Sequence, residues 1–228
     1  LKKADVLITV SNFLGNAINE TVAEKEFNVI PNVVDTSRFY YAENQQINSL
    51  FRFLHVSNLS PIKNPQLMLE AIHLFLQKDQ TAEFVFIGNK TKEWEDEALR
   101  IGIPKKSIHF MGEMHYVRVA EEFRKSNAFF LYSKSETFSC VTAEALCCGL
   151  PIVSSNVGAI PELINSTNGF LTDPTDAEAL ASAMLLVKNN YRNYDRKEIS
   201  KRAIAKYNYQ IVAQQLLFVY QTVLNTKD

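Results

Sequence analysis

The stretch Ala128–Ser155, AFFLYSKSETFSCVTAEALCCGLPIVSS, indicates the fold class of this chain. It begins with an apolar run, passes through a polar turn into a segment rich in Ala, Leu, Val and Cys, and ends on a second apolar run. A strand, a helix and a strand in this order predict two parallel strands joined by a crossover helix. The predicted helix contains a carboxylate, Glu144, and a second one, Glu136, lies eight positions earlier in the polar turn.

The same alternation extends to both sides of this unit. Further strands are predicted at 51–58, 83–89, 107–112 and 169–171, with helices at 64–78, 93–101, 117–126 and 176–187. Alternating units with near-continuous apolar strands predict an α/β fold, a Rossmann-like parallel sheet with helices on both faces. Ligands of such sheets bind beyond the carboxyl ends of the strands. The loops to examine therefore begin at Ser57, Gly88, Gly112, Ser133 and Ser155.

Composition narrows the class of protein. The 228 residues, 46% of them hydrophobic, suffice for one large domain, and 24 basic against 25 acidic residues leave no basic footprint for nucleic acid. No apolar run approaches the roughly 20 residues of a membrane-spanning helix, and no basic and apolar leader opens the chain. Cys140, Cys147 and Cys148 lack zinc-ligand spacing, which predicts reduced, buried thiols in a cytosolic protein.

The usual phosphate-binding loops are absent, because the seven glycines are too widely spaced for G-x-G-x-x-G or a Walker A loop. A helix N-terminus also binds phosphate, and the helix starting near Ser139 follows a strand directly. Glu144 lies about 7.5 Å further along it and leans back toward its start, within reach of a ribose diol. The spacing also permits Glu144 as a solvated helix residue and Glu136 as a helix-capping one.

Two other groups of residues have both functional and structural interpretations. Lys63, the one cation in the loop SNLSPIKNP, is placed to neutralise a diphosphate, although a solvated lysine fits equally well. His55 is predicted to be a core strand residue. The sequence suggests no metal cluster and no Ser-His-Asp arrangement.

An ordered set of motifs resembles the retaining glycosyltransferases of the GT-B fold, family four, often called "group 1". The paired glutamates of that family match ETFSCVTAE, and its G-x-x-P-E stretch matches Gly158, Pro161 and Glu162. NGFLTDPTD at 168–176 and IPNVVDTSRF at 30–39 match two further motifs. Each motif is weak alone, but their order makes the resemblance specific over nearly the whole chain.

The resemblance implies roles for individual residues. Lys63 would bind the donor diphosphate, Glu144 the ribose diol and Glu136 the donor sugar, with Glu136 and Lys63 as the catalytic pair. The backbone of Phe138, Ser139, Cys140 and Val141 would contact phosphate and sugar, and the loop from Gly112 to Met114 would lie against the base. Asn58 stands where the family usually has arginine, so one phosphate contact departs from the pattern. No metal or other cofactor is implied.

The resemblance also implies a domain organisation. Residues 1–30 would be the end of an N-terminal acceptor domain with its linker, 31–205 the nucleotide-sugar donor-binding domain, and 206–228 a helix crossing back to the missing N-terminal half. We expect that helix to expose an apolar stripe formed by Ile211, Val212, Leu216, Val219, Tyr220 and Val223.

The function implied is transfer of a sugar, hexosyltransferase-like and retaining, from a nucleotide-diphosphate sugar to a glycan or lipid-linked acceptor, by a chain that is inactive alone. A nucleotide-sugar epimerase and a non-catalytic sugar-nucleotide-binding or scaffold domain remain alternatives. The partners implied are the donor and the N-terminal acceptor domain, without nucleic acid. The localisation implied is cytoplasmic, with peripheral membrane contact through the missing half left open.

Overall fold

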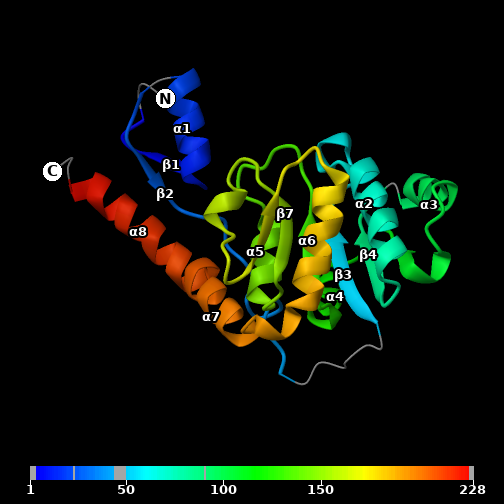
Figure 1. Ribbon diagram of the computed structural model, residues 1–228. Coiled ribbons are helices and arrows are strands. Elements are labelled where there is room, and N and C mark those ends of the chain that lie inside the picture. The colour runs from blue at the N-terminus through cyan, green and yellow to red at the C-terminus, as the bar shows by residue number, and fades with distance from the viewer. Residues whose placement is uncertain (1–3, 23, 44–49, 90, 226–228) are drawn as a thin grey trace.

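The computed structural model describes residues 4–22, 24–43, 50–89 and 91–225. Its main body is a six-stranded sheet in which every pair of neighbours is parallel and the strand order is β5-β4-β3-β6-β7-β8 (Figure 1). The strands are β3 (Phe51–Val56), β4 (Ala82–Ile87), β5 (Ile108–Phe110), β6 (Ala128–Leu131), β7 (Ile152–Ser155) and β8 (Gly169–Thr172). All six overlap the strands predicted from the apolar runs.

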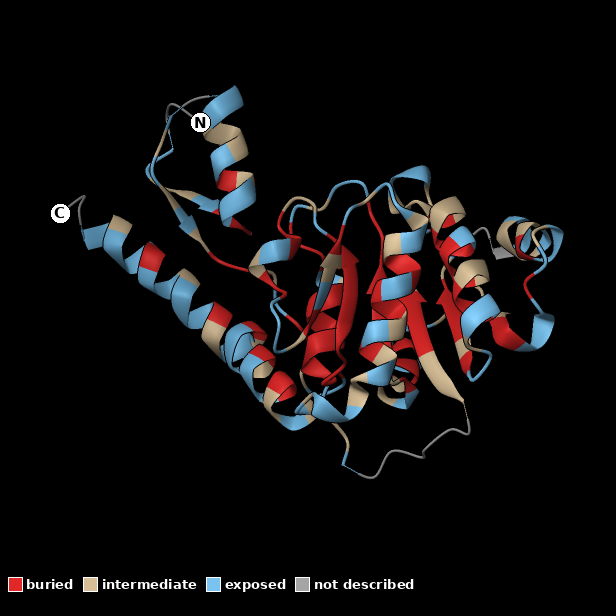
Figure 2. Cartoon of the chain, viewed as in Figure 1, coloured by how far each residue is buried: buried red, intermediate tan, exposed pale blue. Residues whose placement is uncertain are grey.

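Helices cover both faces of this sheet, because its strand residues alternate between two apolar clusters. Leu54 and Phe129 pack with α4 (Tyr116–Lys125), α5 (Cys140–Cys147) and α7 (Arg196–Tyr207). Phe53 and Phe130 face the other side, toward α2 (Pro65–Lys78), α3 (Thr91–Arg100) and α6 (Ala177–Asn189). Figure 2 shows the resulting buried sheet between its covering helices, of which α5 is buried over most of its length and α2 and α6 mainly on their inner sides. The α/β fold predicted from the sequence is confirmed.

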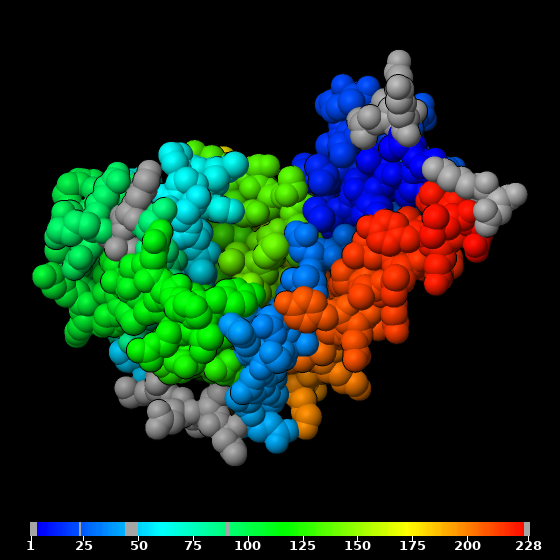
Figure 3. Space-filling view, turned by 180° about the vertical axis from the view of Figure 1, so that it is seen from behind, coloured from blue at the N-terminus to red at the C-terminus, as the bar shows by residue number. Residues whose placement is uncertain are grey.

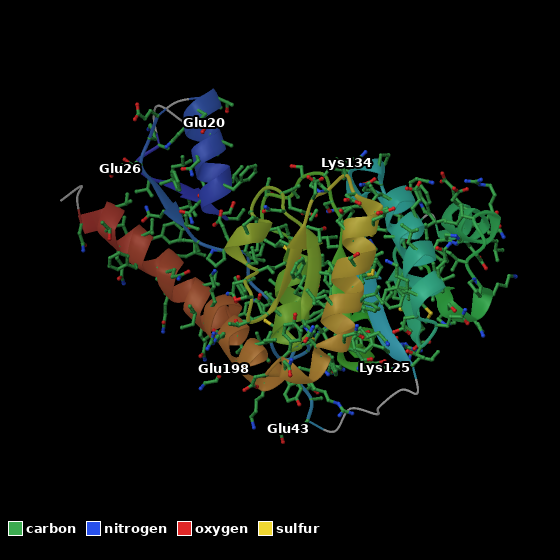
Figure 4. All side chains as sticks on the ribbon, viewed as in Figure 1. Glu20, Glu26, Glu43, Lys125, Lys134 and Glu198 are labelled. Atoms are coloured by element: carbon green, nitrogen blue, oxygen red, sulfur yellow. The ribbon has the colours of Figure 1, made fainter. Side chains whose placement is uncertain are left out.

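The strand order changes direction between β3 and β6. From β3 the chain proceeds outward to β4 and β5, whereas from β6 it proceeds the other way to β7 and β8. Because β3 and β6 are neighbours, the loops that follow them lead to opposite faces of the sheet. Open parallel sheets bind ligands in the crevice at such a switch point. Lys134, in the loop after β6, marks this carboxyl edge in Figure 4, and Glu43 and Glu198 lie toward the opposite edge.

The two terminal segments form a smaller unit beside this body. β1 (Leu7–Thr9) and β2 (Phe27–Val29) make a two-stranded parallel sheet with α1 (Asn12–Thr21). The last helix, α8 (Tyr209–Asn225), follows α7 and extends away from the six-stranded sheet to this unit (Figures 1 and 3). Ile30, Val212 and Val219 form a separate buried cluster there.

The ends of the chain differ from expectation in two respects. The short β2 and the polar α7 were not predicted. The prediction that the apolar stripe of α8 is exposed is also wrong in part, because two of its residues, Val212 and Val219, are buried against Ile30. Of the predicted stripe, Tyr220 is exposed, and the other exposed large apolar side chains of α8 are Tyr209, Leu217, Phe218 and Leu224, outside the stripe.

The prediction for the cysteines is also wrong in part. All three are free thiols, and Cys147 and Cys148 are buried. Cys140 is exposed, because it is the first residue of α5 and lies at the open edge of the sheet rather than beneath it. Among the described residues, no helix combines the length and apolar character needed to cross a membrane.

Candidate functional site

The turn between β6 and α5 holds a backbone conformation that a neighbouring glycine makes possible. Ser139, the N-cap of α5, has left-handed dihedrals of φ 73° and ψ 82°. Ala159 N donates to the carbonyl oxygen of Glu136 at 2.9 Å, and a Cβ on Gly158 would lie only 2.0 Å from that same oxygen. Gly158, the glycine of the G-x-x-P-E motif, is therefore needed because the backbone carrying Glu136 passes directly over it.

The two loops of the switch point meet through an ion pair. Lys63, the last residue of the short 3₁₀ helix η1 (Pro61–Lys63) after β3, places Nζ 2.5 Å from Glu136 Oε1. The Ser133 hydroxyl donates to the same oxygen at 2.7 Å. The side chains of Lys63 and Glu136 are only 21% and 9% exposed. Lys63 and Glu136, which are expected to bind different parts of a donor, thus contact each other directly.

Glu144 is a buried carboxylate on α5, only 7% exposed. The Tyr116 hydroxyl donates to its Oε1 at 2.8 Å, and among the described residues no donor reaches Oε2. Burial raises the pKa of Glu144 to about 7, and the hydrogen bond from Tyr116 opposes that rise. The interpretation of Glu144 as a solvated helix residue is therefore wrong.

Tyr116 is a site residue that the sequence did not reveal. It begins α4, and its ring packs 5.0 Å from Phe39, while the Arg38 guanidinium lies 5.9 Å from the ring centre. Phe39 ends the linker motif, so that motif supports the tyrosine that orients Glu144. Burial and the neighbouring Glu144 charge raise the pKa of Tyr116, which stays a hydrogen-bond donor at neutral pH. No local pattern links positions 28 residues apart.

Tyr116→Phe is expected to raise the pKa of Glu144 above its present value of about 7, because the hydroxyl stabilises the ionised form of the carboxylate. The ring and its packing on Phe39 are retained. Carboxyl ¹³C NMR titration of the ligand-free protein measures the shift, with Tyr220→Phe on the exposed side of α8 as the matched control. An unchanged midpoint in Tyr116→Phe would show that the hydrogen bond has no effect on the carboxylate.

The other predicted site residues lie at the same edge of the sheet. Gly112, with φ +71°, accepts a hydrogen bond from Gly88 N at 2.9 Å, and Met114 packs partly against the core. Asn58 is exposed, and its Oδ1 accepts from Ser60 N at 3.2 Å, which leaves its amide nitrogen to donate.

The residues around the start of α5 differ in what they present. Phe138 is buried, with its ring 5.7 Å from that of Tyr207, so only its backbone faces the edge. Cys140 accepts a hydrogen bond from Asn32 Nδ2 at 3.5 Å, and Val141 packs partly against the core. Backbone amides, rather than side chains, are what this helix start presents.

His55 links the core to the loop that carries Lys63. It is fully buried, as predicted, with Nδ1 3.0 Å from the Phe130 carbonyl oxygen and Nε2 2.6 Å from Ser57 Oγ. Burial lowers the pKa of His55 to about 4, so the ring is neutral at pH 7. With Nδ1 donating to the carbonyl, Nε2 accepts from the Ser57 hydroxyl, which in turn accepts from Leu59 N. This network fixes the beginning of the loop.

The described part of the chain has no metal cluster, and a large hollow in it lies away from the donor-site residues. No three His, Cys, Asp or Glu side chains there gather as a metal site. An open hollow of about 840 Å³ lies between α6, α7 and residues 163–170, and it contains none of the predicted donor-site residues. Charged side chains at its rim pair with each other, as Arg202 does with Glu198 at 2.7 Å.

The sequence matches the family described as "Glycosyl transferases group 1" over residues 41–206. N-acetyl-alpha-D-glucosaminyl L-malate synthase of Bacillus anthracis is 24% identical over 239 residues, which cover 98% of this chain and 60% of that protein. The chain spans 55–60% of the length of such curated relatives.

Solved structures share the fold. HepE of Anabaena, solved in complex with UDP and glucose, has a TM-score of 0.83 at 20% identity, covering 96% of this chain and 63% of that one. The C-terminal domain of LpcC, a glycosyl transferase group 1 protein of Francisella tularensis, has a TM-score of 0.68 at 24% identity, covering 77% and 99%. The chain therefore belongs to the group 1 glycosyltransferases, and its six-stranded domain has the fold of the C-terminal domain of their GT-B architecture.

Proposed function

We propose that the chain binds a UDP-sugar at the carboxyl ends of β3 and β6, as the donor for retaining transfer of a hexose-like sugar to a glycan or lipid-linked acceptor. The observation that carries this proposal is Glu144. Glu144 is held in place by burial and by the hydrogen bond from Tyr116 to Oε1, while Oε2, which no described donor reaches, stays open to accept from the hydroxyls of a ribose.

The diphosphate lies between the start of α5 and the loop after β3. The amides of residues 138–141 and the helix dipole favour negative charge there, and Lys63 adds the cation. Lys63 leaves Glu136 when the diphosphate arrives, and Glu136 then faces the donor sugar. As the leaving diphosphate gains charge during transfer, Lys63 and the amides stabilise it. The Asn58 amide nitrogen supplies a neutral donor where relatives have a charged one.

Uridine as the base is supported by HepE, which has the same fold and was solved with UDP. The loop from Gly112 to Met114 lies against the base, beside Tyr116 and hence beside the ribose. This arrangement puts base, ribose and diphosphate in one line along the carboxyl edge, from β5 toward β6.

The acceptor is bound elsewhere. We assign residues 1–30 to the end of an N-terminal acceptor domain and 206–228 to a helix that returns to it, and the packing of Val212 and Val219 on Ile30 supports this division. The 228-residue chain then binds the donor but transfers no sugar by itself.

Calorimetry with UDP, GDP and ADP at pH 8 tests the proposal, and UDP is expected to bind most tightly. Affinity should fall as the pH is lowered through about 7, because protonated Glu144 accepts the ribose hydroxyls less well. Absence of binding by all three nucleotides would exclude a donor site here. Sugar transfer by the 228-residue chain alone would contradict the division into two domains.

A further inference from the structure

Glu162, the glutamate of the G-x-x-P-E motif, takes no part in the donor site, yet its carboxylate is hydrogen-bonded to the start of α1. Glu162 ends the 3₁₀ helix η3 (Ile160–Glu162), and its carboxylate accepts three hydrogen bonds from the start of α1. Asn12 N and Asn12 Nδ2 each donate to Oε2 at 3.0 Å, and Phe13 N donates to Oε1 at 2.7 Å. Glu162 thus joins two elements about 150 residues apart in sequence.

The start of α1 is chemically suited to a carboxylate. The first amides of a helix lack partners within it, and the helix dipole is positive at this end. Ser11 Oγ accepts from Leu14 N at 3.1 Å, while Glu162 takes the two amides before it. Partial burial acts against ionisation, but these hydrogen bonds hold the pKa of Glu162 below its usual range. The carboxylate is therefore charged at neutral pH, and its bonds to the amides are charge-assisted.

The same helix start also contacts the donor loop, residues 135–139. The Ser11 hydroxyl donates to the Thr137 carbonyl oxygen at 2.6 Å. On its other side the donor loop is bonded to η3, through Ala159 N and Glu136 O. The α1 start, the donor loop and η3 are therefore each bonded to the other two. A displacement of α1 from the body must break the contacts of both Ser11 and Glu162.

Polar contacts, rather than apolar packing, hold α1 here. Gly15 is the only buried residue of this helix, and Phe13 is 39% exposed. A cavity of about 210 Å³ lies beside the contact, between Ser11, Phe138 and Glu162. Figure 1 shows α1 standing apart from the six-stranded sheet. Because this contact buries little apolar surface, α1 can be displaced from the body without exposing the core of the six-stranded domain.

We propose that Glu162 is a positioning residue. Through its hydrogen bonds to the start of α1, it couples the position of α1 on the six-stranded domain to the conformation of the donor loop. The donor loop leads directly into the amides that bind the diphosphate, so the ligand side of this coupling rests on the proposed function. A nucleotide that restrains the donor loop favours the state in which α1 is bonded to Glu162 and Thr137. By linkage, that bonded state raises the affinity for the nucleotide by the same factor. Binding of the donor is thereby communicated to the N-terminal segment.

Hydrogen exchange of backbone amides, measured without nucleotide, shows whether Glu162 affects the donor loop as well as α1 or only holds α1 in place. Glu162→Gln keeps the shape of the side chain but removes the charge. Exchange is expected to become faster both at Leu14 in α1 and at Thr142, whose amide donates to Ser139 O at 3.2 Å just beyond the donor loop. Glu178→Gln, in the first turn of α6, is the matched control and should alter neither. Faster exchange confined to Leu14 would overturn the coupling.

A second measurement adds UDP. In the unaltered protein UDP should slow exchange at Leu14, whereas in Glu162→Gln this protection should disappear and the Kd for UDP should rise about fivefold. Protection of Leu14 and an unchanged Kd in Glu162→Gln would reject the coupling while leaving the donor site intact. If the unaltered protein binds no UDP, the proposed function fails, and the nucleotide-free exchange at Thr142 still decides the coupling.

Discussion

Glu144→Gln is expected to raise the free energy of unfolding at pH 8 by about 3 kcal/mol, an unusual direction for a substitution in a binding site. Burial raises the pKa of Glu144 from 4.5 to about 7, so the folded state binds a proton more tightly than the unfolded chain does. The contribution of protonated Glu144 to the free energy of unfolding is therefore fully present below about pH 4.5, and it is lost as the pH rises through 7. Glutamine never ionises, and its amide oxygen still accepts from Tyr116.

The stability difference should therefore depend on pH in a defined way. It should be small near pH 4.5, grow up to about pH 7 and stay constant above it. Urea unfolding at pH 5, 7 and 8 measures this, with Glu70→Gln on the exposed side of α2 as the matched control. Equal midpoints for the Glu144 variant and the unaltered protein at pH 8 would show that the carboxylate is not desolvated.

The same variant should bind UDP less well. A charged hydrogen bond contributes about 1.5 to 3 kcal/mol, so the Kd at pH 8 should rise roughly tenfold or more. Below the pKa of Glu144 the difference should shrink, because the unaltered residue is then also neutral. A gain in stability together with a loss of affinity is what a carboxylate retained for binding predicts. Undiminished UDP affinity would remove Glu144 from the ribose site.

The sequence could predict the fold because the strands of this sheet are buried on both faces. Runs such as Phe129–Leu131 are then wholly apolar, and the intervening helices are long enough to recognise. The spacing of Ser139 and Glu144 likewise follows from helix geometry alone. These predictions depend only on neighbours in the chain.

The missed features depend on strand order or on weak local patterns. Helix α7 was missed because it buries a narrow stripe, mainly Ile199, Ala203 and Tyr207, on a largely charged segment. Lys63 and Glu136 were both predicted as site residues, but their contact requires β3 and β6 to be neighbours. Tyr116 contacts Glu144, and Glu162 contacts the start of α1. Both contacts join residues far apart in the sequence, so no local spacing could reveal them.

Lys63→Gln is expected to weaken UDP binding roughly tenfold to a hundredfold at low salt, because the variant loses a charge-assisted hydrogen bond to the diphosphate. Calorimetry at rising salt concentration should show a smaller effect, since the screening ions compete for a partly exposed pair. Lys134→Gln, an exposed lysine at the same edge of the sheet, is the matched control and should leave the Kd nearly unchanged.

Glu136→Gln distinguishes the two members of this ion pair. Removing the carboxylate charge frees Lys63 from a partner 2.5 Å away, so affinity for UDP should hold or improve. Affinity for a UDP-sugar should fall relative to UDP, because the group facing the sugar has lost its charge. If Lys63→Gln binds UDP as the unaltered protein does, the lysine serves only to neutralise Glu136. The diphosphate would then be held by the amides of α5 and the amide nitrogen of Asn58, and Lys63 would have no direct role in binding the donor.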